Sequence, residues 1–247
     1  MKNKASFVAV IPARGGSKGI PRKNVALLKG HPLIYYPISL ALANPRIERV
    51  IVSTDDKEIA SMAESLGAEV PFIRPAELAD DRTGDWPVFI HLIEELKKKE
   101  GYEFDYLINL RCTTPFKKAE HIDAAIDLIL ESGADSLRTV DRISGKHHPY
   151  WTFKGDASGC GVPFIDELKL SDYYQRQALP PAYSLNALVD IIKVEVILQR
   201  DSGNLYGCKM KLLETDPRYS MDIDTPYDLE ICEFMAKSLL GTRSDGD

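Results

Sequence analysis

Residues 7–24 read Phe-Val-Ala-Val-Ile-Pro-Ala-Arg-Gly-Gly-Ser-Lys-Gly-Ile-Pro-Arg-Lys-Asn. The apolar run from Phe7 to Ile11 is typical of a short buried strand, and a basic, glycine-rich segment follows it directly. Glycines allow backbone N–H groups to turn onto a phosphate chain, because a residue without Cβ adopts conformations closed to others. A strand followed by such a loop predicts a site for a nucleoside triphosphate.

The cations of this loop suit the same ligand. Arg14 directly precedes the glycines, Lys18 lies between them, and Arg22 and Lys23 follow them. The loop matches neither G-x-G-x-x-G nor G-x-x-x-x-G-K-[ST], so neither the Rossmann fingerprint nor the Walker A loop applies. We expect Arg14 and Lys18 to hold the β- and γ-phosphates and Lys23 to lie nearer the α-phosphate. The alternative is that these side chains only solvate a surface loop, which their place after a strand disfavours.

Strand and helix patterns alternate through residue 140. The expected strands are Phe7 to Ile11, Arg49 to Ser53, Glu69 to Phe72, Tyr106 to Leu110 and Ser136 to Val140, and the expected helices are Leu33 to Ala43, Lys57 to Leu66, Pro87 to Lys99 and Ala119 to Glu131. This rhythm predicts an α/β fold with three layers, a mostly parallel, Rossmann-like sheet covered by helices on both faces. Ligands of such sheets bind beyond the carboxyl ends of the strands. The loops after the first and fourth strands are therefore expected at one rim.

Residues 141–185 interrupt this rhythm with glycines, prolines and aromatic residues. Such a composition favours a protruding arm or small β excursion inserted between two parts of the main domain, residues 1–140 and 186–247. The second part is expected to contain a strand at Leu188 to Lys193, a short helix at Val194 to Arg200, a strand at Tyr206 to Met210 and a helix at Thr225 to Leu240.

A pair of carboxylates, Asp222 and Asp224, stands near the end of the chain. In extended backbone both point to one side, with Ile223 directed into the core. Their hard oxygens suit Mg²⁺ or Mn²⁺, bound together with substrate phosphates. The alternative is that Asp224 or Thr225 only caps the following helix. Asp55 and Asp56 form a rival pair, which is expected to be a turn and a helix N-cap instead.

Composition limits the other functions. The chain has 247 residues, of which 44% are apolar and 28% charged, and its net charge of -6 argues against a general nucleic-acid partner. We expect no membrane partner and a cytoplasmic location, since no apolar run reaches the roughly 20 residues that span a bilayer and the N-terminus lacks a signal-peptide core. The widely spaced cysteines are expected to be reduced thiols. The histidines show no metal-ligand spacing and are expected in solvent or at an interface.

Four segments occur in the order of one known family: the loop at Ile11 to Asn24, Leu110-Arg-Cys-Thr-Thr-Pro-Phe116, Arg176-Gln-Ala-Leu-Pro-Pro-Ala-Tyr-Ser-Leu-Asn186 and Asp222-Ile-Asp-Thr-Pro-Tyr-Asp-Leu229. Together they span nearly the whole chain. The sequence thus resembles the acylneuraminate cytidylyltransferase family, which activates sialic acid and related 3-deoxy-2-keto sugar acids with CTP.

The resemblance implies a role for each matched residue. CTP is expected to contact Ala13, Arg14, Gly15, Gly16, Ser17, Lys18, Lys23, Asn24 and Arg74, and the catalytic groups are expected to be Arg14, Lys18, Lys23 and Asp224. The sugar acid is expected to contact Arg111, Thr113, Thr114, Arg176, Gln177 and Asn186. A guanidinium pairs with a carboxylate through two parallel hydrogen bonds, so Arg111 or Arg176 suits the acid group. The resemblance also implies a metal ion on Asp222 and Asp224, and a homodimer formed through the arm.

Departures from the family pattern cluster on the acceptor side. Arg111 stands where the family usually has glutamine, Cys112 where it has proline and Thr114 where it has serine. Ser184 replaces a frequent arginine, and Asn186-Ala-Leu-Val-Asp190 differs from the common Asn-Gly-Ala-Ile-Tyr. CTP is therefore better specified than the sugar. Legionaminic, pseudaminic and octulosonic-type acids remain candidates beside N-acetylneuraminic acid.

Two other functions stay open. One is nucleotidyl transfer to a sugar 1-phosphate or another phosphorylated acceptor on the same fold. The other is a non-catalytic nucleotide sensor whose altered acceptor loop has lost turnover, although the retention of both Asp222 and Asp224 speaks against such a loss.

Overall fold

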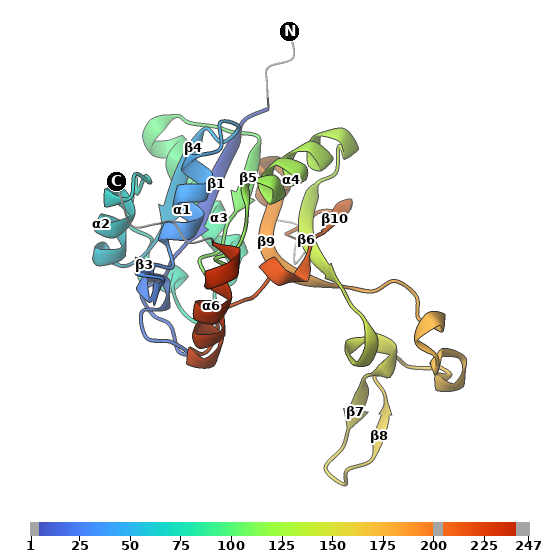
Figure 1. Cartoon of the computed structure of the whole chain (residues 1–247). Coiled ribbons are helices and arrows are strands. Elements are labelled where there is room, and N and C mark those ends of the chain that lie inside the picture. Colours follow the sequence, from blue (N-terminus) through green and yellow to red (C-terminus); the bar gives the residue numbers. More distant parts are fainter. Residues whose placement is uncertain (1–4, 200–204, 241–247) are drawn as a thin grey trace.

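A six-stranded sheet in the order β10-β6-β9-β5-β1-β4 forms the centre of the molecule (Figure 1). The structure is a computed structural model and describes residues 5–199 and 205–240. Its elements are β1 (Phe7–Pro12), β2 (Leu27–Leu28), β3 (His31–Pro32), α1 (Tyr35–Leu42), β4 (Arg49–Ser53), α2 (Lys57–Ser65), α3 (Asp85–Glu100), β5 (Tyr106–Asn109), α4 (Ala119–Ser132), β6 (Ser136–Arg142), β7 (Phe153–Gly155), β8 (Gly161–Pro163), β9 (Tyr183–Lys193), α5 (Val194–Leu198), β10 (Met210–Glu214) and α6 (Pro226–Leu239).

The sheet is mostly parallel, as the alternating pattern predicted. β1 pairs in parallel with both β4 and β5, so that Val10 lies opposite Ile51 on one side and Asn109 on the other. β10 is likewise parallel to β6, whereas β9 runs antiparallel to both β5 and β6. The chain leaves β1 toward β4 and later returns on the other side as β5. A crevice therefore opens beyond the carboxyl end of β1, where ligands of such folds bind.

Helices cover both faces of the sheet, which confirms the predicted three layers (Figure 1). The side chains of β1 alternate between two hydrophobic clusters, because successive residues of a strand point to opposite faces. Ala9 and Ile11 belong to the cluster packed under α1, α2, α4 and α6. Val8 and Val10 belong to the cluster under α3 and α5. β1 is thus buried on both sides and holds the loop that follows it in a fixed place.

Side-chain caps define the helices next to the crevice. Asp56 Oδ1 accepts hydrogen bonds from the backbone N–H groups of Glu58 and Ile59 at 2.9 and 3.0 Å, so the predicted N-cap role of Asp56 is confirmed. At α6, Thr225 and Asp228 form a reciprocal capping box with Pro226 at the first helical position. Thr225 is the cap, which leaves the carboxylate of Asp224 available for another role.

Two predicted strands differ from the structure. Glu69 to Phe72 contributes a single bridge, between Glu69 and Ile51, so the expected strand is wrong. The last strand begins at Met210 rather than Tyr206. The carboxylate of Asp135 accepts from the N–H groups of Cys208 and Lys209, and Gly207 has a φ of 71°, so this stretch forms a turn.

The arm leaves the sheet through two paired strands. β6 and β9 pair up to Arg142 and Tyr183, with a shift of register between Arg138 and Val140. Residues 143–182 then project from the sheet with the β7–β8 hairpin on the projection (Figure 1). Arg200, the expected end of a helix, and residues 241–247 of the expected main domain lie outside the described residues. Within the described part of the chain, no helix combines the length and the apolar character needed to span a bilayer.

Candidate active site

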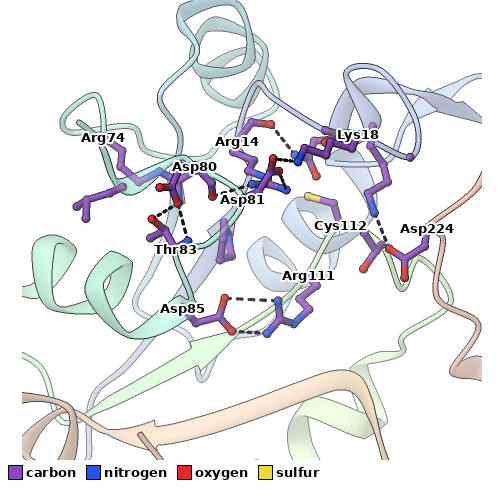
Figure 2. A pocket seen from close by; sticks show the side chains of 17 residues that line it. Arg14, Lys18, Arg74, Asp80, Asp81, Thr83, Asp85, Arg111, Cys112 and Asp224 are labelled. Carbon is purple, nitrogen blue, oxygen red and sulfur yellow. Dashed lines mark hydrogen bonds and ion pairs between the residues drawn. The ribbon is translucent and has the colours of Figure 1, made fainter. Parts of the chain in front are cut away.

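A cavity of about 560 Å³ lies beyond the carboxyl ends of β1 and β5 (Figure 2). Its wall comes from the loop after β1, the loop after β5, the segment that leads into α3, and Asp224 near the end of the chain. The lining residues are Pro12, Arg14, Ser17, Lys18, Gly19, Lys23, Asn24, Arg74, Leu78, Asp80, Asp81, Thr83, Asp85, Arg111, Cys112, Thr113 and Asp224. The two loops predicted to share a rim do so.

The basic loop is neutralised by a carboxylate that the sequence interpretation missed. Asp81 accepts from Arg14 Nη2 at 2.9 Å and from Lys18 Nζ at 2.6 Å (Figure 2). The backbone oxygen of Asp80 accepts a further hydrogen bond from Arg14 Nη1 at 2.8 Å. The hydrogen bond from Lys18, with the nearby charges, holds the pKa of Asp81 below its usual range. The carboxylate of Asp81 therefore already pairs with Arg14 and Lys18, the two cations that were predicted to hold the β- and γ-phosphates.

Lys23, the last cation of the loop, contacts a residue far away in the sequence. Lys23 Nζ lies 2.8 Å from Asp224 Oδ1, although the two residues are separated by 201 positions in the sequence. The side chain of Asp224 is 72% exposed, whereas that of Lys23 is 16% exposed. Ile223, between Asp222 and Asp224, is fully buried while both carboxylates face outward, as the alternating pattern predicted. The acidic segment thus reaches the basic loop.

The glycines of the loop act differently from the prediction. Gly15, Gly16 and Gly19 are not among the glycines with positive φ, so a left-handed backbone is not their role. A Cβ on Gly19 would lie 2.1 Å from the backbone oxygen of Asp224, and one on Gly15 would lie 2.8 Å from Asp56 Oδ2. Gly16 has open space around it. Gly15 and Gly19 therefore permit close packing rather than a special turn.

Arg74 lines the cavity, and part of its guanidinium makes no hydrogen bond within the described residues. The residue is 4% exposed, and its Nη2 lies 3.7 Å from Asp55 Oδ1. Its Nε is buried and has no hydrogen-bond partner within residues 5–199 and 205–240. Burial lowers the pKa of Arg74 and outweighs the nearby Asp55. A buried donor without a partner is costly, so this atom is well suited to a ligand acceptor.

The loop after β5 forms the opposite wall. Arg111 pairs with Asp85 at the first turn of α3 through both guanidinium nitrogens (Figure 2). Burial alone would lower the pKa of Arg111, but Asp85 and Asp190 raise it above its ordinary value. The Arg111 guanidinium, one of the two predicted to bind the acceptor carboxylate, is therefore paired with Asp85 in this structure.

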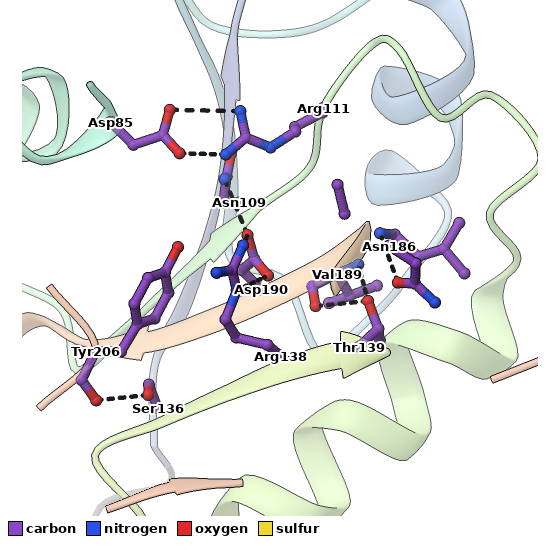
Figure 3. A network of polar contacts seen from close by, with 12 residues as sticks. Asp85, Asn109, Arg111, Ser136, Arg138, Thr139, Asn186, Val189, Asp190 and Tyr206 are labelled. Atoms are coloured by element: carbon purple, nitrogen blue, oxygen red, sulfur yellow. Dashed lines mark hydrogen bonds and ion pairs between the residues drawn. The ribbon is translucent and has the colours of Figure 1, made fainter. Parts of the chain in front are cut away.

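A second polar cluster lies beneath Arg111, and its residues were not predicted (Figure 3). Asp190 is 1% exposed and accepts from Arg138 Nε at 3.0 Å. Asn109 Nδ2 lies 3.4 Å from the same carboxylate, and the Arg138 guanidinium stacks 4.3 Å from the ring centre of Tyr206. Asp190 stands where the family pattern has a tyrosine, and its buried charge is paired with the half-buried Arg138.

The structure gathers only part of the predicted site. Of the predicted residues, those that line the cavity are Arg14, Ser17, Lys18, Lys23, Asn24, Arg74, Arg111, Thr113 and Asp224. Those that lie outside its lining are Ala13, Gly15, Gly16, Thr114, Arg176, Gln177, Asn186 and Asp222.

Several of these outlying residues are occupied by the fold. Ala13 is buried, and its N–H donates to the oxygen of Ser53. Thr114 is fully buried, and its hydroxyl donates to Ala187 O at 3.0 Å. The Asn186 amide donates to Asp141 and Thr215 at 2.7 Å each. The backbone N–H of Gly15 donates to Asp55 at 3.0 Å. Their polar groups are satisfied without a ligand.

The expectation for the histidines is wrong at two positions. His121 is 8% exposed and its Nδ1 accepts the N–H of Lys118 at the start of α4. His148 is 2% exposed and lies 2.9 Å from the oxygen of Pro180 within the arm. Both serve the fold.

One acidic segment and one lysine were missed for different reasons. Asp80, Asp81 and Asp85 form an acidic run opposite a basic loop, and this charge complementarity was a usable signal. Lys117 is 6% exposed, and its Nζ donates to Arg111 O at 2.7 Å, to Thr114 Oγ1 at 2.9 Å and to Thr114 O. Burial lowers the pKa of Lys117 to about 7. A lysine in a polar loop is ordinarily exposed, so the sequence carried no sign of this burial.

The fold and cavity define a nucleotide-binding α/β protein with a cationic phosphate site. The cytidylyltransferase family profile matches residues 8–234. The CMP-N,N'-diacetyllegionaminic acid synthase of Legionella pneumophila subsp. pneumophila is 36% identical over 227 residues, which covers 92% of this chain and 94% of that protein. The enzyme of the same name from Campylobacter jejuni is 31% identical over 233 residues, covering 94% and 95%.

A solved structure shares the fold. The CMP:2-keto-3-deoxy-manno-octonic acid synthetase complexed with CTP has a TM-score of 0.69 at 17% identity, covering 95% of this chain and 100% of that one. The chain belongs to the cytidylyltransferase family. It is a nucleotidyltransferase, and CTP is its nucleotide substrate.

Proposed function

We propose that the protein transfers CMP from CTP to the anomeric hydroxyl of a 3-deoxy-2-keto sugar acid and releases pyrophosphate. The observation that carries this proposal is the meeting of the basic loop, the loop after β5 and Asp224 around one cavity. Arg14, Lys18 and Lys23 each pair with a carboxylate there, so three positive charges are already held in place for a triphosphate.

The reaction is an in-line displacement at the α-phosphorus. The anomeric oxygen forms a bond to phosphorus, the bond to the bridging oxygen of the β-phosphate breaks, and pyrophosphate leaves with the electron pair. Arg14 and Lys18 bind the β- and γ-phosphates after they release Asp81. Lys23 stabilises the charge that develops at the α-phosphate. Positioning and electrostatics supply most of the acceleration in such a site.

The acidic pair fits a divalent cation. Among the described residues, no group of three or more His, Cys, Asp or Glu side chains could enclose a metal. Asp222 and Asp224 are both exposed, and Asp224 borders the cavity. Magnesium is commonly bound by one or two carboxylates plus substrate phosphates, which matches this open donor set. Asp224, with Asp222, would hold Mg²⁺ or Mn²⁺, which neutralises charge on the triphosphate when bound.

For the acceptor we propose a nonulosonic acid. The two synthases of CMP-N,N'-diacetyllegionaminic acid described above match this chain over almost their full length. This compound class is therefore the first to test, with N-acetylneuraminic, pseudaminic and octulosonic-type acids beside it. Cavity residues Arg111 and Asp85 present a charged pair where the family pattern has a neutral amide, which supports an acceptor other than N-acetylneuraminic acid.

The arm is proposed to form a homodimer. Phe153, Val162, Phe164 and Tyr174 leave 55%, 58%, 58% and 86% of their surfaces exposed on it. Such apolar exposure on a projecting segment is typical of an interface. Arg176 and Gln177 lie on the same arm, away from the cavity of their own chain. We expect them to serve the partner's site.

A mixing experiment tests the shared site. Arg176→Ala and Asp224→Asn each inactivate a homodimer if Arg176 completes the partner's cavity. Mixed dimers would then recover about one quarter to one half of the activity, measured after co-refolding and checked by light scattering. No recovery, or a monomer in solution, would contradict the shared site.

Because CTP is consumed, we further place the enzyme in the cytoplasm, which cell fractionation tests.

Pyrophosphate release decides the function. The protein is incubated with CTP, Mg²⁺ and a panel that contains the sugar acids above and sugar 1-phosphates. Turnover with a sugar acid, lost in Asp224→Asn and kept in the distant Asp166→Asn, supports the proposal. Turnover with sugar 1-phosphates alone would indicate the phosphorylated-acceptor alternative. Binding of CTP by calorimetry without any turnover would indicate a sensor.

A further inference from the structure

We propose that Lys117 is a positioning residue that sets the acceptor wall of the cavity by holding the loop after β5 from inside. This inference rests on the proposed function, because the wall matters only if an acceptor binds against it. Lys117 itself does not line the cavity.

The environment of the ammonium group is unusual for a lysine. The residue is 6% exposed, and its Nζ donates to Arg111 O at 2.7 Å, to Thr114 Oγ1 at 2.9 Å and also to Thr114 O. All three oxygens belong to the same loop. An ammonium has three donors, so each is matched by one acceptor. The loop thus wraps the amino group of Lys117, whose protonated form matches all three acceptors.

The outer side of the same loop faces the cavity. Arg111, Cys112 and Thr113 are lining residues, while Thr114 and Lys117 point inward. The held oxygens belong to Arg111 and Thr114, on either side of Cys112 and Thr113. The contacts of Lys117 therefore span the stretch of backbone that forms the wall.

Two further hydrogen bonds attach this loop to neighbouring segments. Thr114 Oγ1 donates to Ala187 O at 3.0 Å, which fixes the loop to β9. The N–H of Ile223 donates to Thr113 O at 2.9 Å, which fixes it to the acidic segment of Asp222 and Asp224. Removing the ammonium leaves three oxygens of the loop without their shared donor. The wall would then shift or loosen, whereas the loop after β1 keeps its own contacts.

Steady-state kinetics separate this role from a general structural one. In Lys117→Met we expect the acceptor KM to rise and acceptor kcat/KM to fall by about 10- to 100-fold, because small misplacements of a substrate are costly. The Kd of CTP, measured by calorimetry without a divalent cation so that Asp222 and Asp224 do not contribute through a metal, should stay within about two-fold. Lys117→Arg, which restores donors, should recover part of the loss. Lys118→Met is the matched control, since the Lys118 Nζ donates to Tyr219 on the surface.

Chemical labelling of Cys112, which needs no enzymatic turnover, also tests whether Lys117 holds the loop. Cys112 is 1% exposed and lies on the held loop, whereas Cys160 and Cys208 are exposed. In a Cys160→Ser, Cys208→Ser background, we expect Lys117→Met to speed modification of Cys112 by about ten-fold or more, followed by mass spectrometry. Lys118→Met should not change it. This labelling remains informative if the proposed function fails.

The outcomes that overturn the proposal are specific. Equal changes in the acceptor KM and the CTP Kd, or unchanged Cys112 labelling in folded Lys117→Met, would show that Lys117 only stabilises the protein. If Lys117→Met does not fold, Thr114→Val replaces it, because it removes one of the three acceptors and the bond to Ala187. The same selective effect on the acceptor KM and on Cys112 labelling is then expected, and its absence would refute the proposal.

Discussion

At the scale of single residues, the pairing of Asp81 with Arg14 and Lys18 makes a prediction about affinity. If Arg14 and Lys18 bind the phosphates of CTP as proposed, CTP must displace this carboxylate before its phosphates reach both cations. Asp81→Asn removes the competing anion at nearly constant size. We expect CTP to bind roughly 3- to 10-fold more tightly, since exposed ion pairs are individually weak. Calorimetry at low salt measures the change.

The control for this prediction is Asp166→Asn, which removes an exposed ion pair on the arm, 2.9 Å from Lys154. Its affinity for CTP should equal that of the unmodified protein. Weaker binding by Asp81→Asn would mean that Asp81 holds the cations in their binding geometry, and the competition argument would be wrong.

Lys23 supports a second prediction at this scale. In the proposed mechanism its ammonium acts where charge develops at the α-phosphate, so its contribution would be larger in the transition state than in the ground state. Lys23→Met is expected to lower kcat by about 100-fold, with a much smaller change in the Kd of CTP. Rapid-quench measurement of CMP transfer tests this. A rise in Kd with unchanged kcat would assign Lys23 to simple binding.

At the scale of elements, the start of α4 depends on a neutral histidine. His121 Nδ1 accepts the N–H of Lys118, and burial lowers the pKa of His121 from its ordinary value. A base with a lowered folded-state pKa binds protons more readily in the unfolded chain. Its stabilising effect is therefore complete above the unfolded pKa of about 6.5 and is lost as the pH falls below it.

The matched variant is His121→Gln, since glutamine at this position accepts the same bond without titrating. We expect the unfolding free energy of the parent protein to fall relative to the variant by about 1 kcal/mol between pH 7.5 and 5.5, the usual worth of a cap. Urea titrations at both pH values measure it. His91, whose pKa burial also lowers, is common to both proteins and cancels. A constant difference would contradict the titration of His121.

Elements were predictable where the local pattern agreed with the tertiary environment. β1, β4 and β5 are buried strands of apolar residues, so their position follows from periodicity. Glu69 to Phe72 has the same appearance but lies beyond β4, where it makes only one bridge. The antiparallel direction of β9 depends on the path through the arm. No short-range pattern encodes that path.

The site, like the elements, was predictable only in part. Cations after β1 and the carboxylate of Asp224 were expected together, and their contact is in the structure. Two residues complete the cavity from the other side: Asp81, in the segment before α3, and Asp85, the first residue of α3. Their place depends on how that helix packs. Burial of Lys117 likewise appears only when the loop folds around it.

At the scale of the whole molecule, Gly19 joins the two ends of the sequence. A Cβ at this position would meet the backbone oxygen of Asp224 at 2.1 Å, an atom that cannot move aside alone. Gly19→Ala should displace Asp224, destabilise the protein by about 1 to 3 kcal/mol and reduce turnover. Gly16→Ala, which meets nothing within 4 Å, should leave the unfolding free energy nearly unchanged. Equal melting temperatures for both variants would show that the contact is loose.

The contact between Gly19 and Asp224 has a consequence for biosynthesis. The first strand and its phosphate loop leave the ribosome early, but the carboxylate that meets Lys23 is added only after more than two hundred further residues. A product terminated prematurely before Asp224 therefore lacks a carboxylate that lines the cavity. Under the proposed function, such an incomplete chain would not consume CTP.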